Sequence, residues 1–189
     1  MLKIVKLPNP ILRKRAKEIE VVTPQIKTLA KEMVATLAPR RKKPLGVGLA
    51  ANQIGKLERI FIMLMPARNA SQRVAGGPEQ NYQVVINPQI LKASKQMVVS
   101  QPEDDRLLEG CLSIPGYYGL VNRPLKIKVK YQDLTGRWHN RGFGLPQSIY
   151  FQHELDHING VLFIDRLVRS HPFYLAGKTG KLREVANPF

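Results

Sequence analysis

Five consecutive residues, His153-Glu154-Leu155-Asp156-His157, constrain the structure of this chain more than any other segment. Residues four apart lie on the same face of an α-helix, so two imidazoles at this spacing can converge on one metal ion when the segment is helical. Glu154 can then act as a general base on a water molecule held by the metal. The alternative is a surface helix with two solvated histidines, and the surrounding sequence has to decide between the two.

The flanks of the motif favour a buried helix. Pro146 suits a first helical turn and Gly160 suits a C-terminal stop, which predicts a helix over 146–158. Ile149 lies on the same stripe as the two histidines and predicts an apolar wall beside the metal. The apolar segment 161–164 is expected to form a strand after the helix. The motif is therefore expected on a core helix, where its ligands have rigid support.

A catalytic divalent metal normally takes three protein ligands and leaves one position for water, so a third ligand is needed. The later candidates lack the spacing expected of HExxH peptidases, and they are Asp165, His171 and Glu184. Position 163 is Phe163, which excludes the peptidase class with a further histidine there. The remaining strong candidate is Cys111, the only cysteine, although a lone cysteine can also be a small buried hydrophobe. A thiolate with two neutral imidazoles gives a site that leaves the fourth position open.

Three segments together resemble the motifs of the peptide deformylase family, GxGLAAxQ, EGCLS and QHExDHxxG. The matching segments, in chain order, are 46–53, 109–113 and 152–160. The likeness extends from the first residues to about Arg166. The resemblance implies that Cys111, His153 and His157 bind the metal, which is the set already reached from the residues.

The resemblance implies a metal-dependent hydrolase that removes the N-formyl group from the initiator methionine of newly synthesised polypeptides and releases formate. Glu154 would take the proton of the attacking water and deliver it to the leaving amine. Donors for the oxygen that gains charge would be the Gln53 side-chain amide and the Leu112 backbone N–H. A Cys-His-His set accepts both Fe²⁺ and Zn²⁺. The likeness favours Fe²⁺ as the native ion, with Zn²⁺, Ni²⁺ or Co²⁺ possible in purified protein.

The resemblance also locates the substrate, with segments 45–48 and 112–116 as the two sides of a peptide groove. The residues expected around the substrate are Gly46, Val47, Gly48, Leu107, Gly110, Ile149 and Tyr150. An ordinary glycine-bearing turn is the alternative at 46–48. Glu109 and Arg123 are expected to form a pair that supports the ligands from behind, with a surface ion pair as the alternative. Tyr117 and Tyr118 depart from the residues of many relatives, so the contacts of the outer groove stay open.

The charge of the chain is strongly positive, with 30 Lys and Arg against 14 Asp and Glu and a formal net charge of +16. Basic clusters occur at 13–15, 40–43 and 178–183 and would attract polyanions in a salt-dependent way. The partners expected are formyl-methionyl nascent polypeptides and, through the basic surface, the ribosome. A non-catalytic nucleic-acid-binding protein is the competing hypothesis, but the chain has no recognisable nucleic-acid motif. A HExxH peptidase is the second competitor.

The compartment follows from three observations. No apolar run approaches the length of a membrane span, so no membrane partner is expected. A single cysteine permits no internal disulfide and, as a metal ligand, favours a reducing compartment. Transit peptides are usually Ser-rich, whereas the first serine here is Ser71. A bacterial-type cytoplasmic enzyme is therefore preferred to an organellar one.

The expected fold class is α+β, with antiparallel or mixed β-sheets around the central HExxH helix in a single domain over 1–189. Thr23-Pro24 opens a second helix whose apolar positions continue to Leu37 at helical spacing. Further predictions are strands at 59–64, 83–86 and 125–131, a long loop at 66–81, and a short basic tail without a helix at 166–189.

Overall fold

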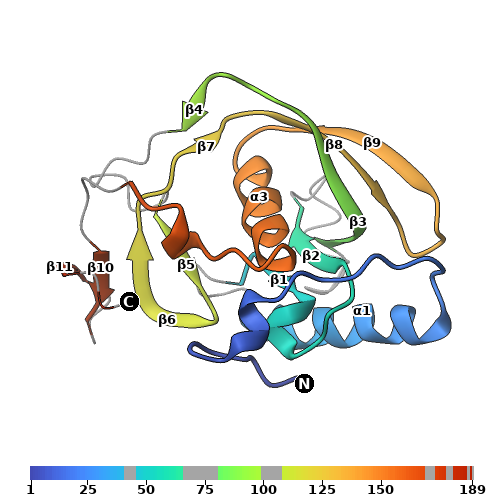
Figure 1. The fold of residues 1–189 in the computed structure, drawn as a ribbon, viewed down its shortest axis with the longest axis horizontal. Coiled ribbons are helices and arrows are strands. Elements are labelled where there is room, and N and C mark those ends of the chain that lie inside the picture. The colour runs from blue at the N-terminus through green and yellow to red at the C-terminus, as the bar shows by residue number, and fades with distance from the viewer. Residues whose placement is uncertain are drawn as a thin grey trace.

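A computed structural model places helix α3 (Gln147–Ile158) in the middle of the molecule with β-sheets around it (Figure 1). The structure describes residues 1–40, 46–65, 81–98, 108–168, 173–177, 181–186 and 188. All strand pairs in the three sheets are antiparallel. The predicted α+β class, with a helix at the centre, is confirmed.

The largest sheet has five strands in the order β1-β2-β3-β8-β9. Their bounds are β1 Gly48–Ala50, β2 Ile60–Leu64, β3 Tyr82–Ala93, β8 Ile127–Gln132 and β9 Trp138–Phe143. Successive side chains of a strand point to opposite faces. In β2, Phe61 and Met63 therefore pack in the cluster that contains Phe151 of α3, whereas Ile60 and Ile62 pack with helix α1 (Pro24–Leu37). The core is thus built on both faces of β2.

The second helix, α1, begins as its sequence predicts. The Thr23 side chain accepts a hydrogen bond from the Ile26 N–H at 3.5 Å, and Pro24 occupies the first turn. The buried positions Leu29, Ala30, Met33 and Leu37 form one side of the helix. Helix α1 therefore follows the expected hydrophobic period and covers one face of the sheet.

Two smaller sheets complete the fold. The four-stranded sheet runs β11-β10-β6-β5, with β5 Glu109–Cys111, β6 Ile114–Gly119, β10 Phe173–Ala176 and β11 Leu182–Val185. The two-stranded sheet pairs β4 Met97–Val98 with β7 Arg123–Pro124. Short 3₁₀ helices lie at Pro10–Arg13, Ala38–Arg40, Ala51–Ile54 and Phe163–Asp165. Strand β5 brings Cys111 beside α3, as shown below.

The structure corrects the strand predicted at 161–164. Leu162 and Phe163 are buried as expected, but the chain forms a 3₁₀ helix from Phe163 to Asp165. The Leu162 N–H donates to the Asp165 carboxylate at 2.8 Å, and Arg13 makes an ion pair with the same carboxylate. This local capping turns the chain, so burial of apolar residues here does not require a strand.

Other strand boundaries differ from the predicted ones because the pairing with neighbouring strands sets them. The strand predicted at 83–86 extends from 82 to 93, because its first half pairs with β2 and its second half with β8. The strands predicted at 59–64 and 125–131 are β2 and β8. The tail after Arg166 has no helix in its described residues, as expected, but contributes the hairpin β10–β11 to the second sheet. The predicted loop at 66–81 lies outside the described residues except for Asn81.

Among the described residues, no helix combines the length and apolar character that crossing a membrane would require.

Candidate active site

Helix α3 and strand β5 bring Cys111, His153 and His157 together. The three residues are buried, and one ligand atom from each lies within 4.8 Å of the others. The Cys111 Sγ lies 3.1 Å from His157 Nε2. The two histidines come from successive turns of α3, and the centroids of their rings are 5.0 Å apart. Cys111 thus forms one cluster with two histidines that lie 42 and 46 positions later in the sequence.

The chemistry and spacing of this cluster fit a divalent metal ion. Zinc-type sites have metal–sulfur distances of about 2.3 Å and metal–nitrogen distances of about 2.0–2.1 Å, which puts tetrahedral ligand atoms roughly 3.5 Å apart. A thiolate and two imidazoles suit Zn²⁺ or Fe²⁺. The Gln53 Nε2 and the Ser113 N–H lie 3.3 and 3.4 Å from the Cys111 sulfur, where they can stabilise a thiolate.

Cys111 is poised to be a thiolate. Burial alone would raise the pKa of its thiol, but the charge of His157 and hydrogen bonding with His153 and His157 hold that pKa well below its usual value. The thiolate is the form that binds a metal.

Glu154 points toward Gly48 at the start of β1. A Cβ at position 48 would lie 2.6 Å from Glu154 Cδ, so only glycine leaves room for this carboxylate. Burial raises the pKa of Glu154 to about 7, even though the neighbouring histidines act to lower it. Its Oε2 is buried and has no hydrogen-bond partner among the described residues. A carboxylate of this kind can exchange a proton near neutral pH. Gly48 was expected around the substrate, and here it also leaves room for the Glu154 carboxylate.

Gln53 is oriented by the backbone that precedes it. Its Oε1 accepts a hydrogen bond from the Ala50 N–H at 2.8 Å. The amide nitrogen is therefore directed the other way, toward Cys111 and the Ser113 hydroxyl, which lies 3.4 Å away. Leu112 directly follows Cys111 at the turn between β5 and β6. Both residues predicted to stabilise the oxygen charge are thus neighbours of Cys111, Gln53 through its amide and Leu112 along the chain.

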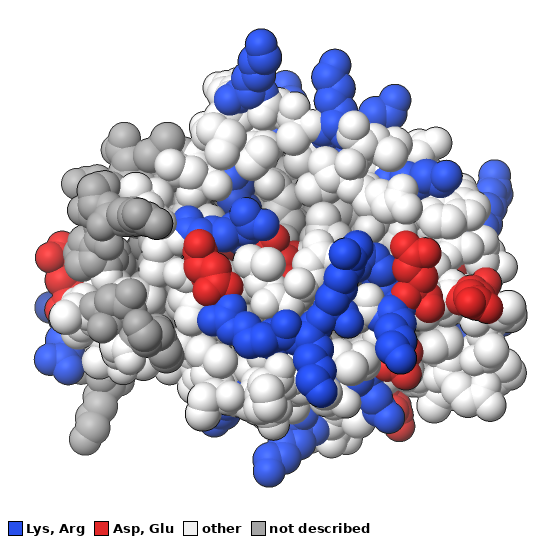
Figure 2. All heavy atoms as spheres, viewed as in Figure 1, with Lys and Arg blue, Asp and Glu red and all other residues white. Residues whose placement is uncertain are grey.

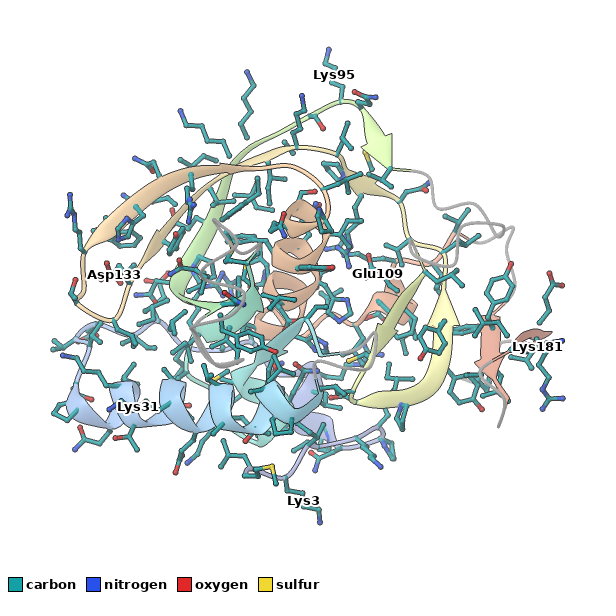
Figure 3. The ribbon with its side chains drawn as sticks, turned by 180° about the vertical axis from the view of Figure 1, so that it is seen from behind. Lys3, Lys31, Lys95, Glu109, Asp133 and Lys181 are labelled. Carbon is teal, nitrogen blue, oxygen red and sulfur yellow. The ribbon has the colours of Figure 1, made fainter. Side chains whose placement is uncertain are left out.

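Behind the ligands, Glu109 and Arg123 form a buried ion pair rather than a surface one. Arg123 Nη2 donates to Glu109 Oε2 at 2.8 Å, and its Nε contacts the other carboxylate oxygen. Burial would raise the pKa of Glu109, but Arg123, followed by His153, lowers it to about 2. Glu109, which is labelled in Figure 3, also has its Oε2 2.8 Å from His153 Nδ1. An ionised Glu109 therefore fixes the orientation of the His153 imidazole and leaves its other ring nitrogen available to a metal ion.

Asp156 is a residue of this site to which the sequence analysis gave no role. Its Oδ2 accepts from Arg123 Nη1 at 2.9 Å, and Arg166 donates to both of its oxygens at 2.5 and 2.7 Å. The sequence does contain a signal for Asp156, because it places a carboxylate directly before His157 on a helix that is predicted to be buried. A buried carboxylate needs a cationic partner. A second such residue is Asn52, whose side-chain amide donates to the His157 carbonyl.

The described residues predicted to line the groove belong to β5, to α3 and to β1 with the two residues before it. The Gly46 carbonyl accepts from the Tyr82 hydroxyl at 2.9 Å, and the Val47 carbonyl accepts from the Leu64 N–H at 2.7 Å. Gly110 pairs with Tyr118 between β5 and β6. The half-buried side chains on this part of the molecule include those of Val47, Ile149 and Tyr150. Leu107 lies outside the described residues.

Comparisons with known proteins agree with this geometry. The family model described as polypeptide deformylase matches residues 1–172. A peptide deformylase of Nitrobacter hamburgensis is 38% identical over 166 residues, which cover 87% of this chain and 85% of the relative. One of Thermomicrobium roseum is 39% identical over 185 residues, which cover 97% and 96%. The crystal structure of peptide deformylase from Thermotoga maritima matches with a TM-score of 0.72 and 34% identity, covering 89% of this chain and 98% of that one. The chain belongs to the polypeptide deformylase family.

Proposed function

We propose that Cys111, His153 and His157 hold the metal of this deformylase and that Glu154 is its acid–base residue. As a family member, the chain is a metal-dependent hydrolase that removes the formyl group from the N-terminal methionine of nascent polypeptides. The observation that carries the assignment is the convergence of the three ligand atoms within 4.8 Å, with the Glu154 carboxylate on the same helix. The family membership argues against both a HExxH peptidase and a protein without catalytic activity.

The residues of the chain divide the reaction between them. A bound divalent ion supplies Lewis-acid chemistry, which activates water and polarises a carbonyl oxygen. Glu154 accepts the proton of the attacking water and returns it to the amine that leaves. The Gln53 amide and the Leu112 backbone N–H donate hydrogen bonds to the formyl oxygen as it gains charge. Because the Ala50 N–H holds the Gln53 side chain, this donor is in place before the substrate binds.

We also propose the identity of the metal and the lining of the groove. Fe²⁺ is the native ion, with Zn²⁺, Ni²⁺ or Co²⁺ able to occupy the same ligands. Gly46, Val47 and Gly110 contact the substrate backbone, and Ile149 and Tyr150 contact the methionine side chain. Leu107, predicted for the same pocket, lies outside the described residues. The whole chain, 1–189, folds as one catalytic domain.

The decisive experiment is a formate-release assay on a formyl-methionyl peptide, with metal analysis of the same anaerobically purified sample. We expect formate and about one equivalent of iron per chain. The acetyl-methionyl peptide serves as the control, because it keeps the amide but adds a methyl group at the reacting carbon. Cleavage of a peptide bond within either peptide would refute the assignment. Formate release by the metal-free protein would also refute it.

Glu109 offers a further test of the site. The change Glu109→Gln keeps the shape of the side chain but removes the charge that holds His153 and pairs with Arg123. Loss of such a supporting carboxylate lowers metal affinity about 10–100-fold. Competition with a chelator measures this affinity directly. The exposed Glu32 on α1 provides the control Glu32→Gln, for which we expect no change.

The partners beyond the substrate follow from charge and reaction. We propose that the enzyme acts in the cytoplasm and that its basic surface holds it near ribosomes, where nascent chains emerge. Binding to ribosomes should then weaken steeply as salt rises, because such contacts release counterions. Cosedimentation of the enzyme with ribosomes at increasing salt concentration measures this binding. Binding that does not depend on salt would contradict the proposal.

A further inference from the structure

One face of the largest sheet carries basic, amide and aromatic side chains and is not part of the active site. In β8, Val129 and Tyr131 pack in the core cluster with α3. Lys128 and Lys130, which alternate with them, therefore point to the opposite face. Helix α1 packs on that opposite face over β1 and β2, and Lys128 is exposed. We call this uncovered area the lysine face, and it consists of Gln89, Lys92, Lys128, Lys130, Trp138 and Asn140.

Like charges lie directly opposite each other on the lysine face. Lys92 of β3 is the cross-strand partner of Lys128, and like charges in this position destabilise a sheet. Strands β3, β8 and β9 contain no Asp or Glu that could compensate. Figure 2 shows Lys and Arg, and no Asp or Glu, along the upper edge of the molecule, where Figure 1 places these strands. A bound polyanion would remove this repulsion.

The aromatic residue of the lysine face distinguishes among polyanions. Trp138 is 44% exposed, and the Lys130 Nζ lies 4.5 Å from the centroid of its ring. Lys130 has Gln89 and Asn140 as its cross-strand partners on either side, both of them exposed amides. An exposed indole beside a cation suits a stacked base and its phosphate, and amides can bond to base edges. A duplex hides its base faces, whereas a single strand presents them.

We propose that the lysine face binds single-stranded RNA. Lys92, Lys128 and Lys130 contact the phosphates, and Trp138 stacks on a base. Figure 3 labels Lys95 and Asp133, which lie near the two ends of this stretch of sheet, just beyond β3 and β8. RNA rather than DNA is chosen because the substrate of the enzyme is made on RNA, a step that rests on the function given above. The surface differs from the clusters at 13–15, 40–43 and 178–183.

The single tryptophan of the chain makes the test direct. Titration of the metal-loaded enzyme with a uridine dodecamer should quench Trp138 fluorescence in a saturable way that salt reverses. Heparin, which has charge but no bases, should not quench it at equal occupancy. Tighter binding to a DNA strand of the matching sequence than to the RNA would overturn the proposal. A blue shift of the Trp138 emission with phosphatidylserine vesicles, without any change in the emission on addition of RNA, would also overturn it.

Two variants locate the binding. Lys128→Gln with Lys130→Gln removes two phosphate contacts, so the slope of log affinity against log salt should become shallower by about 1.4. Lys27→Gln with Lys31→Gln removes the same charge from exposed positions of α1 and should leave the slope unchanged. Both double variants should keep formate release. An equal effect of the two double variants would show attraction by net charge alone and would refute a specific face.

The aromatic contribution is tested separately by anisotropy of labelled RNA. Trp138→Leu should weaken binding about fivefold or more, because base–aromatic stacking is worth about 1–3 kcal/mol per base. Trp138→Phe keeps an aromatic ring and should recover most of this loss. If the Leu variant binds as tightly as the parent, Trp138 does not stack on a base and the proposed mode is wrong.

Discussion

Glu154→Gln is expected to abolish most of the deformylase turnover while the metal stays bound. The change keeps the size of the side chain but removes its ability to accept a proton. General acid–base groups contribute about 10²–10⁴-fold, and Glu154 serves two proton transfers, so we expect a loss in kcat at or beyond the upper end. Formate release from a formyl-methionyl peptide, together with metal analysis of the same sample, measures both quantities.

Binding of the formyl peptide to the Glu154→Gln protein should be largely retained, because Gln53 and Leu112 are unchanged. The second measurement is therefore a dissociation constant for the peptide, obtained by calorimetry. A variant that still released formate within about tenfold of the parent, or that lost its metal, would show that Glu154 is not the acid–base residue. Glu32→Gln on α1 is again the matched control for the charge change.

Cys111→Ser is expected to have the second large effect, and this time on the metal itself. A hydroxyl resists deprotonation, whereas the surroundings of Cys111 hold the pKa of its thiol well below its usual value. Metal affinity should fall by more than the roughly 10–100-fold expected for a supporting residue such as Glu109. Chelator competition gives the affinity, and the thiolate-to-metal absorption of the Co²⁺ form should disappear.

Ser113→Ala is the control for that experiment, since it changes a buried side chain near Cys111 but keeps the three ligands. Thermal unfolding of both metal-free proteins would show whether the fold is retained. An unaltered metal content in Cys111→Ser would remove Cys111 from the ligand set.

Air is expected to inactivate the iron form of the parent protein, through oxidation of the metal or of the thiolate.

The sequence alone was sufficient to propose two metal ligands and to predict the helix α3 that carries them. His153 and His157 need only the helical period to share a face, and that period is a local property. The same holds for α1, whose start at Thr23-Pro24 and apolar stripe are read within a few turns. Cys111 was reached by elimination and then by the resemblance of three motifs. Candidate catalytic residues that belong to short sequence motifs can therefore be predicted before the fold is known.

Strand boundaries were less predictable, because they depend on the partner strand. β3 extends beyond its apolar segment since its second half pairs with β8 and has little core to cover. The segment 161–164 is apolar and buried, yet the Asp165 cap turns it into a 3₁₀ helix. The hairpin β10–β11 exists through its pairing with β6. None of these features has a local period that distinguishes it.

The sequence by itself thus determined which residues can perform the chemistry, and the tertiary structure decided how they are held. Only the fold shows that Gly48 makes room for the Glu154 carboxylate, that Asp156 joins Arg123 to Arg166, and that Lys92 lies opposite Lys128. Each of these contacts joins residues on different elements. Such contacts form when burial of the core fixes the packing of helices and sheets, and a pattern within one element cannot specify them.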